Sequence, residues 1–188
     1  MIKTENKEQA LCVQCGLCCT GVLFNKARLR NNEKDIRLAE KLTLKVIKMN
    51  ERYAFSLPCH HYINHYCSVY HKMERPRVCR NFVCKLIFSF RSGDVNFAEA
   101  EKIIWAAKSK AGELADAKAQ FEVFNHVNVA AVGKRLDLLR LNCPDESVYR
   151  KKYGKVIIHH YVLMEFLREH FYKLKNSIQD SKTNTMKE

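Results

Sequence analysis

The sequence predicts a mainly α protein with a small β-hairpin, in which an irregular, cysteine-rich N-terminal half packs on a helical C-terminal half. Three observations indicate this fold class. Eight of the nine cysteines lie before residue 85. Two runs rich in β-formers flank a short Asn-Glu turn, and capped, apolar-faced segments follow residue 96. Apolar residues make up 47% of the 188-residue chain, which is enough to bury a core without disulfides.

The N-terminal half carries few regular elements. We expect residues 1–10 to be frayed because they are polar. The run "NNEKDIRLAEKL" predicts a helix, which Asn32 caps and which places its apolar residues on one face. Residues 44–49 and 52–57 predict the two strands of the hairpin.

Residues 59–84 predict a loop-rich segment that holds cysteines and histidines. Pro76 starts a short helical turn within it, and this turn presents Cys79. The apolar run "KLIFSFRSGD" then continues the core, and Gly93 breaks the chain.

Helices dominate the prediction for the C-terminal half, beginning with a capping box formed by Asn96 and Glu99. The predicted segments run from Asn96 to about Lys110, onward through Val123, from Val129 to Leu141 with an interruption at Gly133, and from Pro144 into a long last helix. On that helix, the residues expected to share one face are Ile157, Tyr161, Met164 and Phe171.

These elements divide the chain into three parts. Residues 11–90 form a cysteine-cluster region, and residues 91–175 form a helical region that shares the same core. Residues 176–188 are expected to be a disordered tail.

Clustered cysteines in a cytoplasmic chain predict metal binding or redox chemistry. The polar N-terminus has no apolar segment of the signal-peptide kind, and no run of about 18 apolar residues suggests a membrane span. We therefore expect a cytoplasmic protein without a membrane partner. Disulfides are rare in that reducing compartment, so nearby thiols there more often hold a metal.

The thiols form three blocks: C-x2-C-x2-C-C, C-x7-C and C-x4-C. A two-residue spacer lets successive thiolates turn toward one ion or cluster, and Gly16 suits such a turn because glycine tolerates a positive φ. Neighbouring side chains point in different directions, so Cys18 and Cys19 can feed two sites. The alternative is that the thiols pack as small apolar groups. As ligands they predict two four-ligand centres or one multinuclear centre: Cys12, Cys15, Cys18, Cys19, Cys59, Cys67, Cys79 and Cys84.

The spacing favours an iron-sulfur cluster slightly over Zn2+. Three cysteines at three-residue intervals, with a fourth from afar, are typical of a [4Fe–4S] run, although no proline follows Cys84. Guanidinium groups beside Cys79 can offset thiolate charge and donate to sulfur, and these come from Arg75, Arg77 and Arg80. Four histidines lie between the later cysteines, and a solvated or supporting role is expected for them rather than ligation: His60, His61, His65 and His71.

Three segments resemble the C-x-x-C-x-x-C-C cysteine-cluster family, also called YkgJ-type: "CVQCGLCC", "LPCHHYINHYCSVY" and "RPRVCRNFVC". The resemblance covers roughly residues 12–88. It implies a domain proposed to chelate zinc or iron, related to flagellin lysine N-methylase, with the eight clustered cysteines as ligands. The loop "HHYINHY" is longer and richer in histidine than the family's usual loop, which leaves the ligand set of that block open.

Three classes of function remain open from the sequence. The first is a metal-binding protein without catalytic activity, whose protein partner is not identified. The second is a cluster-dependent enzyme such as a protein lysine N-methylase, although the chain contains no G-x-G-x-x-G loop. The third is an electron-transfer or nucleic-acid-associated role. The sequence does not decide whether the protein is an enzyme.

Basic charge predicts only weak, salt-sensitive attraction to nucleic acid. The net charge of +13 is spread along the chain, and no aromatic-basic platform accompanies it. In electrophoretic mobility shifts, we expect binding without sequence preference that is lost by about 200 mM salt, because phosphate contacts weaken steeply over that range. A sequence-specific complex that survives this salt concentration would contradict the prediction.

Overall fold

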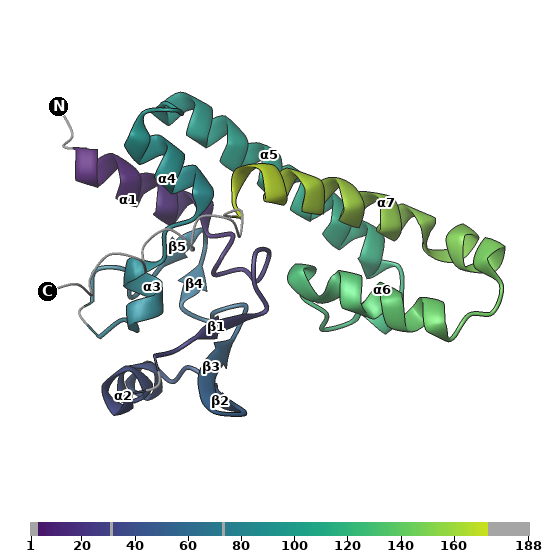
Figure 1. Cartoon of the computed structure of the whole chain (residues 1–188), viewed down its shortest axis with the longest axis horizontal. Coiled ribbons are helices and arrows are strands. Elements are labelled where there is room, and N and C mark those ends of the chain that lie inside the picture. Colours follow the sequence, from purple (N-terminus) through teal and green to yellow (C-terminus); the bar gives the residue numbers. More distant parts are fainter. Residues whose placement is uncertain (1–3, 31, 73, 173–188) are drawn as a thin grey trace, which may run out of the picture.

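The computed structural model describes residues 4–30, 32–72 and 74–172 (Figure 1). Its fold class is the predicted one: helices predominate, a small antiparallel sheet lies in the N-terminal half, and the C-terminal half is helical. The predicted tail, residues 176–188, lies outside the described residues. Among the residues described, no helix combines the length and apolarity that a bilayer crossing requires.

The N-terminus differs from the prediction, because helix α1 (Thr4–Cys15) occupies most of the segment expected to fray. Leu11 is fully buried in the core. Arg91 donates two hydrogen bonds of 2.6 Å to the carboxylate of Glu8, and the Lys108 ammonium donates to the Gln14 carbonyl. These contacts come from residues far along the chain, so tertiary packing orders a helix that its own sequence does not favour.

The predicted hairpin is present as β2 (Val46–Met49) and β3 (Arg52–Ser56), which pair antiparallel with Val46 opposite Phe55. The sequence did not indicate β1 (Lys26–Arg28), which pairs on the other edge of β3 and gives the order β1-β3-β2.

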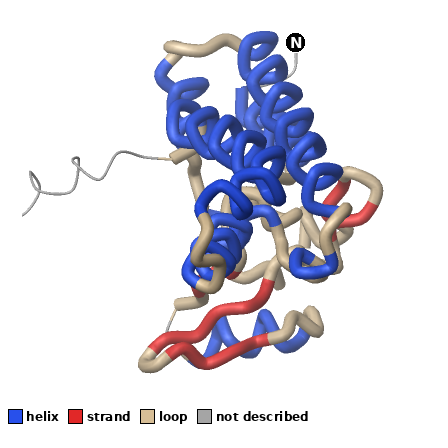
Figure 2. Tube along the Cα trace, turned by 90° about the vertical axis from the view of Figure 1, so that its right-hand side faces the viewer, coloured by secondary structure: helices blue, strands red, loops and turns tan. Residues whose placement is uncertain are grey.

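Helix α2 (Glu33–Lys41) packs against this sheet (Figure 2). Asn32 caps it as predicted, because its side chain accepts a hydrogen bond from the Asp35 amide. The helix and sheet enclose a small apolar cluster, called the sheet cluster here, with these buried residues: Leu29, Ala39, Leu42, Leu44, Phe55, Leu57 and Val69.

Short elements fill the cysteine- and histidine-rich segment. Strands β4 (Tyr62–Ile63) and β5 (Tyr66–Cys67) form a two-stranded ladder. The predicted turn after Pro76 is helix α3 (Arg77–Asn81). Helix α4 (Lys85–Ser92) follows and ends at Gly93, whose φ of 85° confirms the predicted break in the chain.

A buried carboxylate joins α2 to α3. Asp35 is only 4% exposed. One of its oxygens accepts from the Arg30 amide at 2.9 Å, and the other accepts from the Arg77 amide at 2.7 Å. The position of α3, and therefore of Cys79, depends on this carboxylate.

Helices make up the second half of the described chain, and the longest two lie side by side (Figure 1). The predicted capping box of Asn96 and Glu99 is confirmed at the start of the first of them. The elements are α5 (Phe97–Ala119), the 3-10 turns η1 (Glu122–Phe124) and η2 (Val129–Ala131), α6 (Val132–Leu141) and α7 (Glu146–His170).

Three local predictions in this half were wrong. Helix α5 does not end near Lys110, because an alanine-rich buried face continues to Ala117. Gly133 does not interrupt a helix; the change from 3-10 to α geometry comes just before it. Tyr161 is 64% exposed, because the buried row of α7 runs through other residues: Tyr149, Tyr153, Val156, Leu163 and Leu167.

One apolar cluster, called the helical cluster here, joins both halves of the chain. Ala107 and Ala111 on α5 allow close approach of α7, which contributes Val156 and Leu163. Leu17, from the cysteine-rich segment, is buried in the same cluster.

The end of the described chain returns to the cysteine-rich half. The Phe171 carbonyl accepts from the Lys85 amide at 3.1 Å. The Tyr172 hydroxyl donates to the Leu23 carbonyl at 2.9 Å. These hydrogen bonds hold the start of α4 and the loop after the first cysteines against the end of α7.

The Asp35 contact predicts a stability effect. In Asp35→Asn, the new side-chain NH2 group is a donor and cannot accept a hydrogen bond from one of the two backbone N–H groups. We therefore expect a loss of about 1–3 kcal/mol in the free energy of unfolding. Glu33→Gln is the matched control, because this exposed carboxylate in the same turn pairs with Arg37 at the surface; it should change stability by less than about 0.5 kcal/mol. Equal urea midpoints for the two variants would contradict this role of Asp35.

Candidate metal centre

The first cysteine block is positioned by the end of α1 and a tight loop. Cys12 and Cys15 lie on α1, which ends at Gly16 with a φ of 62°, as the sequence predicted for this glycine. The Leu17 carbonyl accepts from the amides of Val22 and Leu23 at 3.0 and 3.2 Å. This loop carries Cys18 and Cys19 and is anchored by the buried side chain of Leu17, which is 2% exposed.

The later cysteines come from separate elements. Cys59 follows the sheet, and its amide donates to the Cys19 carbonyl at 2.8 Å. Cys67 lies on β5, and Cys79 lies on α3. Cys84 precedes α4 as its N-cap residue and is buried. The structure therefore brings all three sequence blocks to one region between the sheet and the helices.

Four thiols are neighbours at the side of the helical cluster: Cys12, Cys15, Cys18 and Cys84. Burial raises the pKa of Cys15 to about 12 and that of Cys18 well above its ordinary range. For Cys12 and Cys15, the Cys84 sulfur is the neighbouring thiol that raises the pKa most after burial. Burial therefore disfavours the thiolate form of Cys12, Cys15 and Cys18.

The other four thiols are neighbours at the side of the sheet: Cys19, Cys59, Cys67 and Cys79. Burial raises the pKa of Cys79 to about 12, and Cys59 is the thiol that adds most to this rise. Burial is also the main cause of the raised pKa of Cys19, followed by Cys67, Cys79 and Cys59.

The thiols are neighbours rather than a finished coordination sphere. Within the described ranges, no three cysteine, histidine, aspartate or glutamate side chains are placed closely enough to hold one ion. Metal binding at either group of thiols would require side chains to turn toward a common point.

Tyr62 lies between the two groups of thiols, and the sequence analysis did not identify it as a site residue. Burial raises its pKa to about 12, and the next causes are thiols of both groups, with Cys19 first and Cys15 second. Its hydroxyl lies so close to Gly16 that a Cβ added there would approach it to 1.9 Å. The only signal in the sequence was an aromatic residue placed between two cysteines.

Of the three predicted arginines, only Arg75 brings its side chain to the thiols. Its guanidinium lies 4.2 Å from the centre of the Tyr70 ring and lowers the pKa of Cys12 and Cys79 against the larger effect of burial. Its buried Nε has no hydrogen-bond partner among the described residues. Arg77 contributes its backbone amide to Asp35, and Arg80 is exposed on α3.

Two of the four histidines face α2 and the loop that follows it. The His61 Nε2 lies 2.8 Å from the Leu42 carbonyl, and the His60 Nε2 lies 3.2 Å from the Thr43 hydroxyl. His65 and His71 instead line a cavity on the other face of α1.

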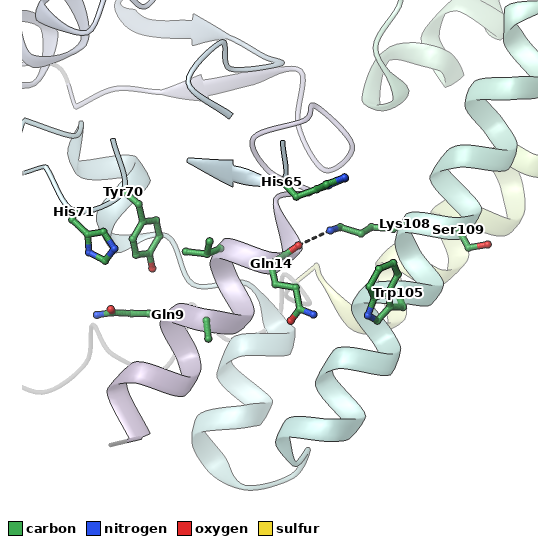
Figure 3. A pocket seen from close by; sticks show the side chains of 10 residues that line it. Gln9, Gln14, His65, Tyr70, His71, Trp105, Lys108 and Ser109 are labelled. Atoms are coloured by element: carbon green, nitrogen blue, oxygen red, sulfur yellow. Dashed lines mark hydrogen bonds between the residues drawn. The ribbon is translucent and has the colours of Figure 1, made fainter. Parts of the chain in front are cut away.

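This cavity has a volume of about 880 Å3 and lies beside α1 (Figure 3). Trp105 and Lys108 of α5 lie on one side of α1, and Tyr70 and His71 lie on the other. The α1 residues that line it, among them Val13, lie on the face opposite Cys12. No cysteine or carboxylate is among the described residues that line the cavity, and its side chains of the kind that bind metals are those of His65 and His71.

The Gly16–Tyr62 contact predicts a specific stability loss. Gly16→Ala places a side chain in the left-handed region and against the Tyr62 ring. Gly93→Ala is the matched control, because Gly93 also has a positive φ but nothing lies within 4 Å of its added Cβ. In denaturant titrations, Gly16→Ala should lose about 1–3 kcal/mol more than Gly93→Ala. Equal losses in the free energy of unfolding for the two variants would show that the Tyr62 side chain can move aside without cost.

Comparison with known proteins agrees with the pattern of cysteines. The model of the CxxCxxCC family matches residues 11–119. The match begins at Leu11 in α1 and ends with the last residue of α5. No curated protein and no solved structure matches the chain. Because the match spans more than half of the 188 residues, the protein belongs to the CxxCxxCC family, a domain proposed to chelate zinc or iron.

Proposed function

We propose that this protein binds zinc or iron through the thiolates of its eight clustered cysteines. The observation that carries the proposal is the convergence of thiols from four elements that lie far apart in the sequence. A thiol whose pKa is raised is costly to ionise alone, but a metal ion stabilises the thiolate form directly. The family's description as zinc- or iron-chelating supports the same reading.

The donor set fits such a group. Cysteine sulfurs are the ligands that zinc and iron-sulfur clusters share. The Nε of Arg75, which has no hydrogen-bond partner among the described residues, is available to donate to a thiolate. The guanidinium lies near Cys12 and Cys79, one from each group of thiols. Leu11 and Leu17 exclude water beneath the first cysteine block. When bound, zinc would supply a structural cross-link, whereas an iron-sulfur cluster would supply a centre for electron transfer.

We favour an iron-sulfur cluster slightly over zinc. Cys12, Cys15 and Cys18 lie at three-residue intervals on one helix end and its loop, and Cys84 approaches them from α4. This combination of three local thiols and one distant thiol is typical of cluster sites. We also propose a cytoplasmic location, where the thiols would stay reduced.

We further propose that residues 11–90 and 91–175 act as one unit rather than as two domains. Leu11 and Leu17 of the first region are buried together with Ala107 and Leu163 of the second, which supports a common core. Loss of metal should then disturb the cysteine-rich region more than α5 and α7, because the long helices pack through apolar contacts.

The metal assignment is tested by Cys15→Ser, with Cys143→Ser as the matched control. Cys143 lies between α6 and α7, where its thiol contacts the Asp145 carbonyl at 3.4 Å. After anaerobic purification, Cys143→Ser should keep the wild-type metal content, whereas Cys15→Ser should contain less metal than the wild type and become protease-sensitive before Asn96. Broad visible absorbance would identify a cluster, and a colourless zinc-containing protein would identify zinc. Wild-type protein that binds neither metal would contradict the proposal.

A further inference from the structure

We propose that the eight cysteines form two separate metal centres, held by Cys12, Cys15, Cys18 and Cys84 in the first and by Cys19, Cys59, Cys67 and Cys79 in the second. The inference rests on the proposed function, since it assumes that these cysteines bind metal. It decides between the two arrangements that the sequence left open, two centres or one multinuclear centre.

The apolar packing of the chain separates the cysteines first. Cys84 is a member of the helical cluster, and Cys15 and Cys18 pack against that cluster. Cys59 and Cys67 pack against the sheet cluster instead. The two sets of thiols therefore pack against different apolar clusters.

Backbone contacts assign two further cysteines to the sheet side. The Cys59 amide donates to the Cys19 carbonyl, which holds Cys19 beside the sheet cluster. Asp35 holds α3 against α2, and Val78 of α3 packs against the sheet cluster. Cys79 lies on the same five-residue helix, so the position of α3 places it on the side of the sheet cluster.

Cys12 belongs with the helical side through α1. It lies one helical turn before Cys15, so the two side chains share a face of the helix.

The adjacent residues Cys18 and Cys19 are the point at which the two groups divide. Cys18 packs against the helical cluster, whereas the Cys19 carbonyl accepts a hydrogen bond of 2.8 Å from the amide of Cys59, which packs against the sheet cluster. Neighbouring side chains on this tight loop thus reach different partners. Tyr62 lies between the groups, since its amide donates to the Cys59 carbonyl at 3.0 Å and its hydroxyl donates to the Val13 carbonyl of α1 at 3.5 Å.

A set of serine substitutions tests this division. Cys18→Ser and Cys19→Ser are neighbours in the chain, yet each should remove a different centre. The combination Cys18→Ser/Cys84→Ser changes one group twice, and Cys19→Ser/Cys84→Ser changes both groups. Cys143→Ser controls for the loss of a thiol elsewhere. The chains are reconstituted anaerobically, metal per chain is measured, and circular dichroism reports whether α5 and α7 remain folded.

Each single variant should retain about half of the wild-type metal. The double variant within one group should retain as much as a single variant, whereas the double variant across the groups should retain almost none. One shared centre would give a different result: single variants would lose all the metal while folded, or both double variants would lose equal amounts. That result would overturn the division while leaving metal binding intact. Wild-type protein without metal would instead overturn the proposed function.

Cobalt(II) titration of the wild-type chain gives a second measurement that requires no variant. Two separate centres should take up two equivalents with equal thiolate-to-cobalt absorbance per ion, and the electron paramagnetic resonance signal should be that of isolated high-spin ions. Saturation at one equivalent, or loss of signal through magnetic coupling between sulfur-bridged ions, would contradict two separate centres.

Discussion

The tight loop from Gly16 to Leu23 is the constraint on which the rest of the structure depends. Gly16 ends α1 in a left-handed conformation, and the Leu17 carbonyl accepts two amides, so the chain reverses within a few residues. The Leu17 side chain is buried in the helical cluster, which fixes the loop against α5 and α7. In the proposed arrangement of two centres, a looser loop would let Cys18 and Cys19 reach the same partners.

The two apolar clusters give the thiols unequal support. The helical cluster includes Leu17, Ala107 and Leu163, and it would exist without any metal because long helices supply most of it. The sheet cluster is drawn from a nine-residue helix and short strands. Structure around Cys59 and Cys67 should therefore rely more on bonds to metal than structure around Cys84 does.

Features set by neighbouring residues were predictable, and features set by distant residues were not. Asn32 and Asn96 each cap a helix through a residue three positions later, so the sequence alone identified both caps. Helix α1 escaped prediction because Glu8 finds its partner, Arg91, 83 residues later. Likewise, the cysteine spacing predicts thiol ligands, but the proposed assignment of Cys18 and Cys19 to different centres depends on the packing around each thiol.

The attachment of the end of α7 to the cysteine-rich half has a consequence for biosynthesis. Lys85, directly after Cys84, is held by Phe171, and Leu23 is held by Tyr172. On the ribosome, the surroundings of Cys84 therefore stay incomplete until almost the whole described chain has emerged. The sheet cluster, by contrast, is built from described residues between Phe24 and Val78. The thiols beside the sheet can thus reach their folded surroundings early in translation, and those beside the helices can do so only near its end.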